Sequence, residues 1–213
     1  METVAVIDYG MGNLRSVQKA LEYVSRNQQR VLVTNEKAAI LEADRLVFPG
    51  QGALRDAMEE LEKADLIDVV KKTIGSRPFL GICLGLQALY ETSEEADDVT
   101  GMSTFPGQVV RFPNSTDNQG RTLKVPHMGW NNVSQKIEHP LWNRIANDSY
   151  FYFVHSYFVE PVDKHNIAAT SEYGEEFVCA VNYDSTFAVQ FHPEKSQRAG
   201  LQLLSNFLQW KPG

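Results

Sequence analysis

Cysteine is scarce in this sequence, which has only Cys83 and Cys179 in 213 residues. The two thiols are far apart and lack the spacing of metal ligands, so neither a disulfide framework nor a zinc site is indicated. Each of the two cysteines is therefore expected to be either a catalytic residue or a buried structural residue. Cys179 lies in the apolar run at residues 177–181, which favours a buried structural residue.

The sequence also has no basic block. The 27 acidic residues outnumber the 20 basic ones, the formal charge is −7, and both signs are mixed along the chain. A polyphosphate-binding surface has no electrostatic support in such a sequence. We therefore expect no nucleic-acid partner.

Long apolar runs are missing as well. No window approaches the roughly 20 apolar residues that span a bilayer. The first ten residues, METVAVIDYG, have no basic segment and too short an apolar run for a signal peptide. We therefore expect a cytoplasmic protein with no membrane partner.

The order of apolar runs predicts the fold class. With 43% hydrophobic residues the chain can bury a sizeable core, and we expect one domain over residues 1–213. Strands are predicted at residues 4–7, 31–34, 46–48 and 79–82, and helices at residues 14–24, 54–61 and 66–74. This alternation is typical of βαβ units and an α/β fold.

After about Gly101 the pattern changes to closely spaced strands. These are predicted at residues 108–112, 150–154, 167–171, 178–182 and 187–190, before a closing helix at residues 198–210. We expect a central, mostly parallel mixed sheet flanked by helices, partly antiparallel in its second half. The polar residues 114–121 are expected to form an exposed loop.

The strongest local signal is GICLG at residues 81–85, between a predicted buried strand and a helix predicted at residues 86–91. It has the form of a nucleophile elbow with Cys83 in place of serine, because the flanking glycines permit a sharp, strained turn. The following helix would lower the thiol pKa, and the Leu84 N–H could face a developing oxyanion. A buried cysteine in a glycine-flanked turn is the alternative that this motif leaves open.

A second signal is QFHPE at residues 190–194. Residues two apart in extended chain face the same side, so His192 and Glu194 are predicted to lie next to each other. The pair suits a general base and the carboxylate that orients it. An isolated motif of this kind favours a loop histidine beside an exposed glutamate, and only its combination with Cys83 favours catalysis.

Two glycine-rich turns complete the set. FPGQG at residues 48–52 can turn its peptide units over and expose N–H groups, as an oxyanion hole requires, although it also fits an ordinary βα turn. The turn at residues 10–12 lacks a dinucleotide fingerprint, because Arg15 takes the third glycine position. We expect no cofactor and no metal.

Three motifs follow one another along the chain: a strand ending in PGxG, then GxCxGxQ, then HPE. In this order they resemble the pattern of the class I (triad) glutamine amidotransferases, and the resemblance covers essentially the whole chain. Three longer segments carry a finer resemblance, to the glutaminase subunits of imidazole glycerol phosphate synthases in histidine biosynthesis. They are DYGMGNL at residues 8–14, PHMGWN at residues 126–131 and YFVHSY at residues 152–157. The resemblance implies the class I glutamine amidotransferase fold.

The resemblance also implies roles. Cys83 would attack the side-chain amide of glutamine, His192 would carry the proton to ammonia, Glu194 would orient His192, and a γ-glutamyl thioester would then be hydrolysed. Gln87 and Glu95 would hold the α-amino and α-carboxylate ends of glutamine. Backbone at further positions would complete the pocket: Gly50, Gly52, Leu84, Ser156 and Tyr157. Gln51 departs from the commonest family pattern, which has a small or apolar residue there.

A partner is implied in the same way. The resemblance implies a heterodimer with a (β/α)₈ cyclase subunit that uses the ammonia to make imidazole glycerol phosphate and AICAR, so we expect hydrolysis to be gated. Residues 49–52 suit the gate best, because their glycines permit two backbone arrangements. The expected contacts are Asn13, Met128, Trp130, Tyr152 and Lys195. We interpret His127 and His155 as packing or interface residues, and His139 and His165 as surface residues.

Two other hypotheses remain. The same chemistry serves anthranilate, aminodeoxychorismate and pyridoxal phosphate synthesis, but those families lack PHMGWN. The second hypothesis is a catalytically silent regulator that binds glutamine on the same fold. The presence of all three triad residues, Cys83, His192 and Glu194, argues against it.

Overall fold

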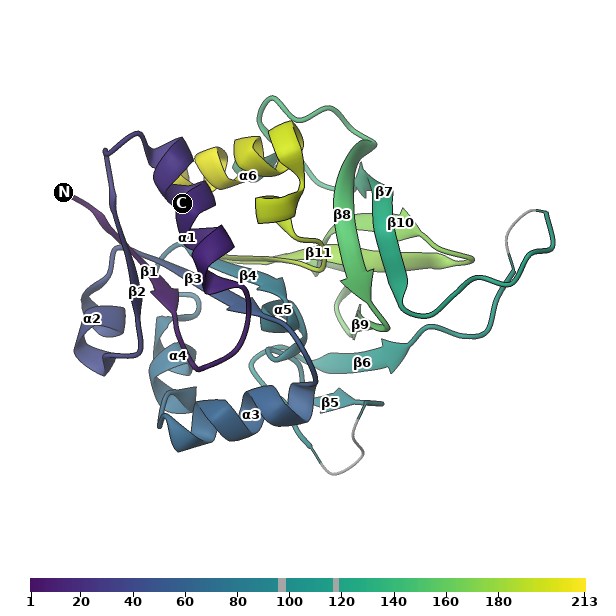
Figure 1. The fold of residues 1–213 in the computed structure, drawn as a ribbon, viewed down its shortest axis with the longest axis horizontal. Coiled ribbons are helices and arrows are strands. Elements are labelled where there is room, and N and C mark those ends of the chain that lie inside the picture. Colours follow the sequence, from purple (N-terminus) through teal and green to yellow (C-terminus); the bar gives the residue numbers. More distant parts are fainter. Residues whose placement is uncertain (96–98, 117–118) are drawn as a thin grey trace.

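The structure, a computed structural model, describes residues 1–95, 99–116 and 119–213. A twisted sheet runs through the molecule, and helices cover both faces of its N-terminal half (Figure 1). The α/β class and the mixed sheet flanked by helices, expected from the sequence, are confirmed.

Parallel strands form the first half of the sheet, in the order β2, β1, β3, β4, β12. Their bounds are Arg30–Thr34, Thr3–Ile7, Arg45–Gly50, Phe79–Cys83 and Thr186–Val189. β3, β4 and β12 are buried along their whole length, which explains their uninterrupted apolar runs. The carboxyl ends of β3 and β4 meet at one edge, where Gly50 is paired with Cys83.

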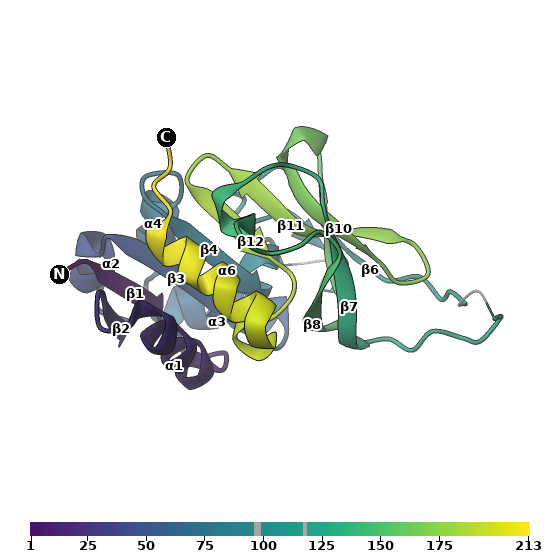
Figure 2. The same ribbon diagram turned by 90° about the horizontal axis from the view of Figure 1, so that it is seen from above.

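Helices lie on both sides of this half. α1 (Leu14–Ser25) and α6 (Gln197–Gln209) cover one face, and α3 (Leu54–Lys63) and α4 (Ile67–Thr73) lie on the other (Figures 1 and 2). A short α2 (Lys37–Glu42), absent from the sequence prediction, follows β2. None of the helices in the described ranges is long and apolar enough to cross a membrane.

The second half is antiparallel, as the closely spaced strands indicated. From β12 the sheet continues through β11, β10, β7 and β8, with bounds Glu176–Tyr183, Ile167–Glu172, His127–Gln135 and Ser149–His155. β9 (Tyr157–Pro161) joins β11 to β6 (Gly107–Arg111), and β6 pairs with the short β5 (Thr92–Ser93). Single 3₁₀ turns occur at Pro140–Trp142, Lys164–Asn166 and Pro193–Lys195.

The predicted helix at residues 86–91 is wrong. The helix there, α5 (Leu84–Gln87), is one turn that begins directly after Cys83. After Gln87 the N–H groups of Leu89 and Tyr90 bond to the carbonyls three residues back, as in a 3₁₀ turn, and the carbonyls of residues 88–91 accept hydrogen bonds from the N–H groups of residues 101–105, which cross beside them. The chain therefore tightens after α5 and continues as a partner of residues 101–105 instead of as an α-helix.

The antiparallel pair β7–β8 has one inner and one outer side. His127 and Phe153 point into the core, whereas three large side chains on the outer side are exposed: Met128 (62%), Trp130 (46%) and Tyr150 (62%). We call these three residues, with Tyr152 opposite Trp130 in the register, the outer β7–β8 face. This alternation decides that His127 is a packing residue and not an interface residue.

Two further histidines were expected at the surface. His165 is exposed, in agreement with that expectation. His139 is only half-exposed, because its ring packs against Phe187 and Trp210, so the surface assignment of His139 was wrong. The polar residues 114–121 were expected to form a loop, and residues 117 and 118 of this stretch lie outside the described ranges.

Candidate active site

Cys83 occupies a sharp turn between β4 and α5. Its backbone has φ 55° and ψ −110°, a conformation that residues other than glycine rarely adopt. The residue is 7% exposed. This is the geometry of the predicted elbow, with the thiol at the end of the buried strand.

Gly85 allows this turn to pack against the neighbouring strand. A Cβ atom at Gly85 would collide with the carbonyl oxygen of Phe48 in β3. A Cβ at Gly81, on the other side of the turn, would lie 2.9 Å from the Cβ of Ala188. Only glycine at both positions lets β3, β4 and β12 approach each other so closely.

His192 and Glu194 form a buried pair beside this turn. His192 Nδ1 lies 2.8 Å from Glu194 Oε1, and the two side chains are 3% and 1% exposed. The prediction that they are neighbours is confirmed, but the cause is different: the chain turns into the 3₁₀ segment Pro193–Lys195 and does not stay extended. Because Nδ1 faces a carboxylate, it carries a proton.

The charges around His192 favour its protonated form. Burial alone lowers the pKa of this imidazole, but the negative charge of a Cys83 thiolate and the Glu194 carboxylate outweigh it and raise the pKa to about 9. Among the described residues, His192 Nε2 and Glu194 Oε2 have no hydrogen-bond partner. Because Glu194 holds Nδ1, Nε2 is the ring nitrogen that interacts with Cys83.

A cavity of about 400 Å³ opens over Cys83 and His192, within the usual size range of small-molecule sites. Six of the substrate-binding residues expected from the sequence line it: Gly52, Leu84, Gln87, Glu95, Ser156 and Tyr157. Gly50 does not. It is buried behind the lining, where a Cβ atom would meet the Tyr9 hydroxyl and lie 2.8 Å from the Cβ of Leu84.

Two polar side chains in the wall are held by defined hydrogen bonds. Gln87 Nε2 donates to the Tyr157 carbonyl and to Gln190 Oε1, at 3.0 Å in each case. Glu95 Oε2 accepts from the Leu54 N–H at 2.7 Å, which caps the first turn of α3. Both side chains are therefore fixed before a ligand enters.

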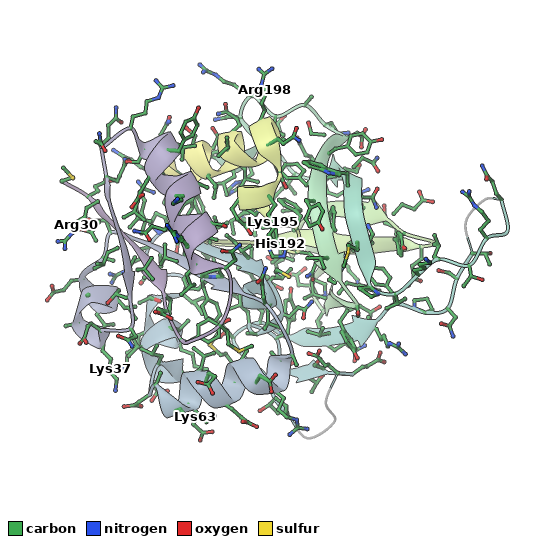
Figure 3. All side chains as sticks on the ribbon, in the orientation of Figure 1. Arg30, Lys37, Lys63, His192, Lys195 and Arg198 are labelled. Atoms are coloured by element: carbon green, nitrogen blue, oxygen red, sulfur yellow. The ribbon has the colours of Figure 1, made fainter. Side chains whose placement is uncertain are left out.

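The expected interface residues divide into two groups. Tyr152 and Lys195 line the cavity mouth, where Lys195 Nζ lies 5.9 Å from the centre of the Tyr152 ring, which Trp130 contacts edge-on. Figure 3 shows Lys195 beside His192, between the helical half and the β7–β8 strands. Asn13 is not among the lining residues; it is exposed at the start of α1, next to Gly12, which packs near Gly50, and its side chain accepts a hydrogen bond from the Ser16 N–H.

Sequence reasoning missed two buried residues of the site. Gln190 is completely buried, and its Nε2 lies 3.6 Å from the Cys83 sulfur. A polar side chain ending an apolar strand was the signal that could have found it. Tyr9 is 3% exposed, its hydroxyl has no hydrogen-bond partner in the described part of the chain, and burial raises its pKa well above the usual value.

Other site types find no support. Cys179 is fully buried, and burial raises its thiol pKa, in agreement with a structural residue. Within residues 1–95, 99–116 and 119–213, no group of three or more His, Cys, Asp or Glu side chains is placed to hold a metal ion. The chemistry that this cavity offers is that of a thiol, an imidazole and a carboxylate.

Comparisons with known proteins agree with this site. The family described as "Glutamine amidotransferase class-I" matches residues 5–210. The chain is 54% identical over 214 residues to the imidazole glycerol phosphate synthase subunit HisH of Nitrosospira multiformis, covering 100% of both chains. It is also 54% identical over 210 residues to subunit HisH 1 of Pseudomonas aeruginosa, covering 99% of this chain and 98% of that one.

Solved structures share the fold at low sequence identity. A protein described as one subunit of a putative GMP synthase, from Thermoplasma acidophilum, superposes with a TM-score of 0.68 at 20% identity, covering 98% of this chain and 93% of that one. A structure described as a glutamine amidotransferase has a TM-score of 0.71 at 17% identity, covering 97% of both chains.

Proposed function

Because this chain belongs to the class I glutamine amidotransferases, we propose that it is the glutaminase subunit of an imidazole glycerol phosphate synthase in histidine biosynthesis. It hydrolyses glutamine to glutamate and ammonia, and the ammonia passes to a cyclase subunit. The observation that carries the proposal is the convergence of Cys83 with the buried His192–Glu194 pair on one cavity.

The first half of the reaction forms a thioester. The Cys83 thiolate attacks the side-chain amide carbon of glutamine, and the oxyanion that develops lies near the Leu84 N–H at the start of α5. His192 then gives its Nε2 proton to the nitrogen, the C–N bond breaks, and ammonia leaves. Glu194 keeps the proton on the opposite ring nitrogen, so that Nε2 is the one that exchanges.

The second half releases glutamate. A water molecule gives a proton to His192 and attacks the thioester carbonyl, and the C–S bond breaks to restore the Cys83 thiolate. This order needs His192 to alternate between acid and base. A neighbouring thiolate raises its pKa, and conversion of that thiolate to a neutral thioester removes the effect and makes His192 a better base.

The polar wall selects an amino acid. Both hydrogens of Gln87 Nε2 are used within the protein, which leaves its Oε1 to accept a hydrogen bond from the α-ammonium group of glutamine. The Glu95 carboxylate lies in the same wall and adds the negative charge that an ammonium group requires, so both side chains serve the α-amino end and neither holds the α-carboxylate, which a carboxylate would repel. Backbone at Gly52, Ser156 and Tyr157 completes the cavity.

The cyclase subunit docks at the outer β7–β8 face. This face carries Met128, Trp130 and Tyr150, which are more exposed than large apolar side chains usually are, and it adjoins Lys195 and Tyr152 at the cavity mouth. Tryptophan and tyrosine are the residues that contribute most at protein interfaces. A partner bound here covers the mouth from which ammonia leaves.

Partner binding also gates hydrolysis. Residues 49–52 form the end of β3 and the turn after it, where Gly52 has φ 96°. Such a turn has two backbone arrangements, and only one aims an N–H group at the oxyanion. Loss of one oxyanion donor lowers turnover by about 10²- to 10³-fold, which is enough for an off state.

Ammonia release is the test. The isolated chain should hydrolyse glutamine slowly, and the cyclase subunit carrying its phosphoribosyl substrate should raise kcat by at least ~10²-fold. Full-speed hydrolysis by the isolated chain would disprove gating, and stimulation confined to KM would mean that the partner completes the pocket instead. No ammonia release in the complex would support a silent glutamine-binding regulator.

A further inference from the structure

A buried histidine pair begins in the wall of the cavity, which His155 lines, and extends behind it to His127. His127 in β7 and His155 in β8 are 3% and 6% exposed, and His127 Nδ1 lies 3.0 Å from His155 Nε2. Burial lowers the pKa of His127 to about 4 and that of His155 to about 3, so both rings are neutral near pH 7. The mechanism proposed above uses neither ring.

The neighbours of the pair determine where its protons lie. His155 Nδ1 is 2.8 Å from the Tyr157 carbonyl, which only accepts, so His155 Nδ1 carries the proton. His155 Nε2 then accepts from His127 Nδ1–H. His127 Nε2 in turn accepts from the side-chain amide of Asn131, at 3.3 Å, and that amide also donates to the Glu172 carbonyl at 2.7 Å.

The chain of hydrogen bonds continues to the nucleophile. The Tyr157 carbonyl that accepts from His155 also accepts from Gln87 Nε2, at 3.0 Å. Gln87 donates its second hydrogen to Gln190 Oε1, and Gln190 Nε2 reaches the Cys83 sulfur at 3.6 Å. Every step from Asn131 to Cys83 therefore joins a donor to an acceptor.

The two ends of this chain lie in functionally different places. Asn131 and His127 occupy the inner side of β7, the strand whose outer side carries Met128 and Trp130. Gln190 lies between the end of β12 and His192, without solvent access. An amide N–H beside a sulfur favours the thiolate over the thiol, because hydrogen bonds to a charged acceptor are stronger than those to a neutral one.

We propose that Gln190 is a further catalytic residue, which donates a hydrogen bond to the Cys83 thiolate, and that His127 and His155 are positioning residues that hold it there through Tyr157 and Gln87. The inference rests on the function proposed above and adds to it a physical link between the docking strand β7 and the nucleophile. A shift of β7 on docking changes the bond accepted by His155 and, through it, the donor at the sulfur.

The pH profile of Cys83 alkylation by iodoacetamide tests this link in the full-length chain. Gln190→Met keeps the length of the side chain and removes the donor, and it should raise the pH of half-maximal alkylation by about one unit. His127→Phe keeps the stacking on Phe153 and Tyr173, removes the relay, and should raise the midpoint by less. Peptide mass analysis identifies the labelled cysteine.

The double variant Gln190→Met with His127→Phe distinguishes one connected series of hydrogen bonds from two independent effects on Cys83. Once Gln190→Met has removed the donor, adding His127→Phe should produce no further shift, because the relay then has nothing to position. An unchanged midpoint in Gln190→Met, or additive shifts in the double variant, would overturn the inference. His139→Phe is the matched control, since that histidine packs outside the chain of hydrogen bonds and should leave the midpoint unchanged.

A substitute variant and an assay that does not depend on hydrolysis keep the alkylation experiment decisive. Should His127→Phe unfold, Asn131→Ala removes the terminal donor at a half-buried position, together with the bonds of that side chain to the Glu172 carbonyl and the Asn132 N–H, and should shift the midpoint in the same direction. Alkylation needs no glutamine hydrolysis, so the two proposals fail separately. A complex that releases no ammonia while Gln190→Met still shifts the midpoint rejects the glutaminase function alone, and an active enzyme with an unshifted Gln190→Met rejects this inference alone.

Discussion

His192 Nδ1 and Glu194 Oε1 are 2.8 Å apart in a pair that is almost completely withdrawn from solvent. A carboxylate in that position is stable only because the imidazole compensates its charge, and the imidazole in turn keeps one tautomer. The ring is therefore oriented before glutamine binds. This orientation leads to the first prediction.

His192→Asn should abolish glutamine hydrolysis almost as completely as loss of Cys83, because residues of one catalytic unit act together. Glu194→Gln should retain more activity, since a side-chain amide oxygen still accepts the Nδ1 hydrogen bond. It should also lower the pKa of His192 from about 9, because the carboxylate contributes to raising it. Steady-state assays and the pH dependence of kcat measure both effects. Equal losses in the two variants would mean that Glu194 does more than orient.

Cys83→Ser and Cys83→Ala should both abolish hydrolysis and leave the fold and the partner complex intact, because a hydroxyl is a far weaker nucleophile than a thiolate near neutral pH. Cys179→Ala is the matched control and should stay active, since that thiol is completely buried away from the cavity. Labelling of Cys179 by iodoacetamide with concomitant inactivation, while Cys83 stayed unmodified, would show that the nucleophile was misassigned.

Gly85→Ala should destabilise the fold by about 2 kcal/mol or more, because the new methyl group meets the Phe48 backbone, which cannot move aside as a flexible side chain can. Urea unfolding followed by circular dichroism measures the change. Gly213→Ala, whose added carbon meets no atom within 4 Å, should have no effect. Normal stability in Gly85→Ala would contradict the close approach of β3 to the elbow.

Trp130→Ala should weaken binding of the cyclase subunit by roughly 30-fold, the effect of losing an interface residue worth about 2 kcal/mol. Isothermal titration calorimetry with the purified partner measures the affinity. Tyr23→Ala removes an aromatic side chain that is 73% exposed on α1, away from the outer β7–β8 face, and should leave the affinity within twofold. Equal effects of the two substitutions would place the interface elsewhere.

The free energy of unfolding should fall as the pH is lowered from 6.5 towards 4. Burial lowers the pKa of His127 to about 4 and that of His155 to about 3, from the usual 6.5. In this window the unfolded chain binds more protons than the folded chain, so stability is complete above pH 6.5 and is lost on acidification. Each histidine contributes up to ~1.4 kcal/mol per pH unit.

Urea unfolding at pH 7.0, 6.0 and 5.0 measures this slope. His127→Phe removes one titrating group and should make the slope shallower by about one proton. A slope that did not change in this variant would show that His127 is protonated in the folded protein, which would also break the hydrogen bonds assigned to the pair.

Much of the fold followed from local patterns. The helix predicted at residues 14–24 is α1 (Leu14–Ser25), and the strand predicted at residues 79–82 is β4 (Phe79–Cys83). These elements carry their own signals, a 3.6-residue period and a continuous apolar run. The helix predicted at residues 86–91 ends at Gln87, because the chain there tightens into 3₁₀-type bonds and then pairs with residues 101–105, contacts that a local period does not encode. The surface assignment of His139 failed for a similar reason, since its ring packs on Phe187 and Trp210.

The sequence by itself determined the candidate groups for the proposed chemistry, because Cys83 and the His192–Glu194 pair stand in short motifs that can be recognised from their spacing. The tertiary structure alone decided what surrounds them: Gln190 at the sulfur, and a neutral histidine pair of which His155 lines the cavity and His127 lies behind it. Hydrogen-bond partners such as Gln87 and Gln190 are 103 residues apart in the chain. A buried polar group takes whichever partner the packed strands bring within about 3 Å, and that choice depends on the register of the whole sheet and not on neighbouring residues.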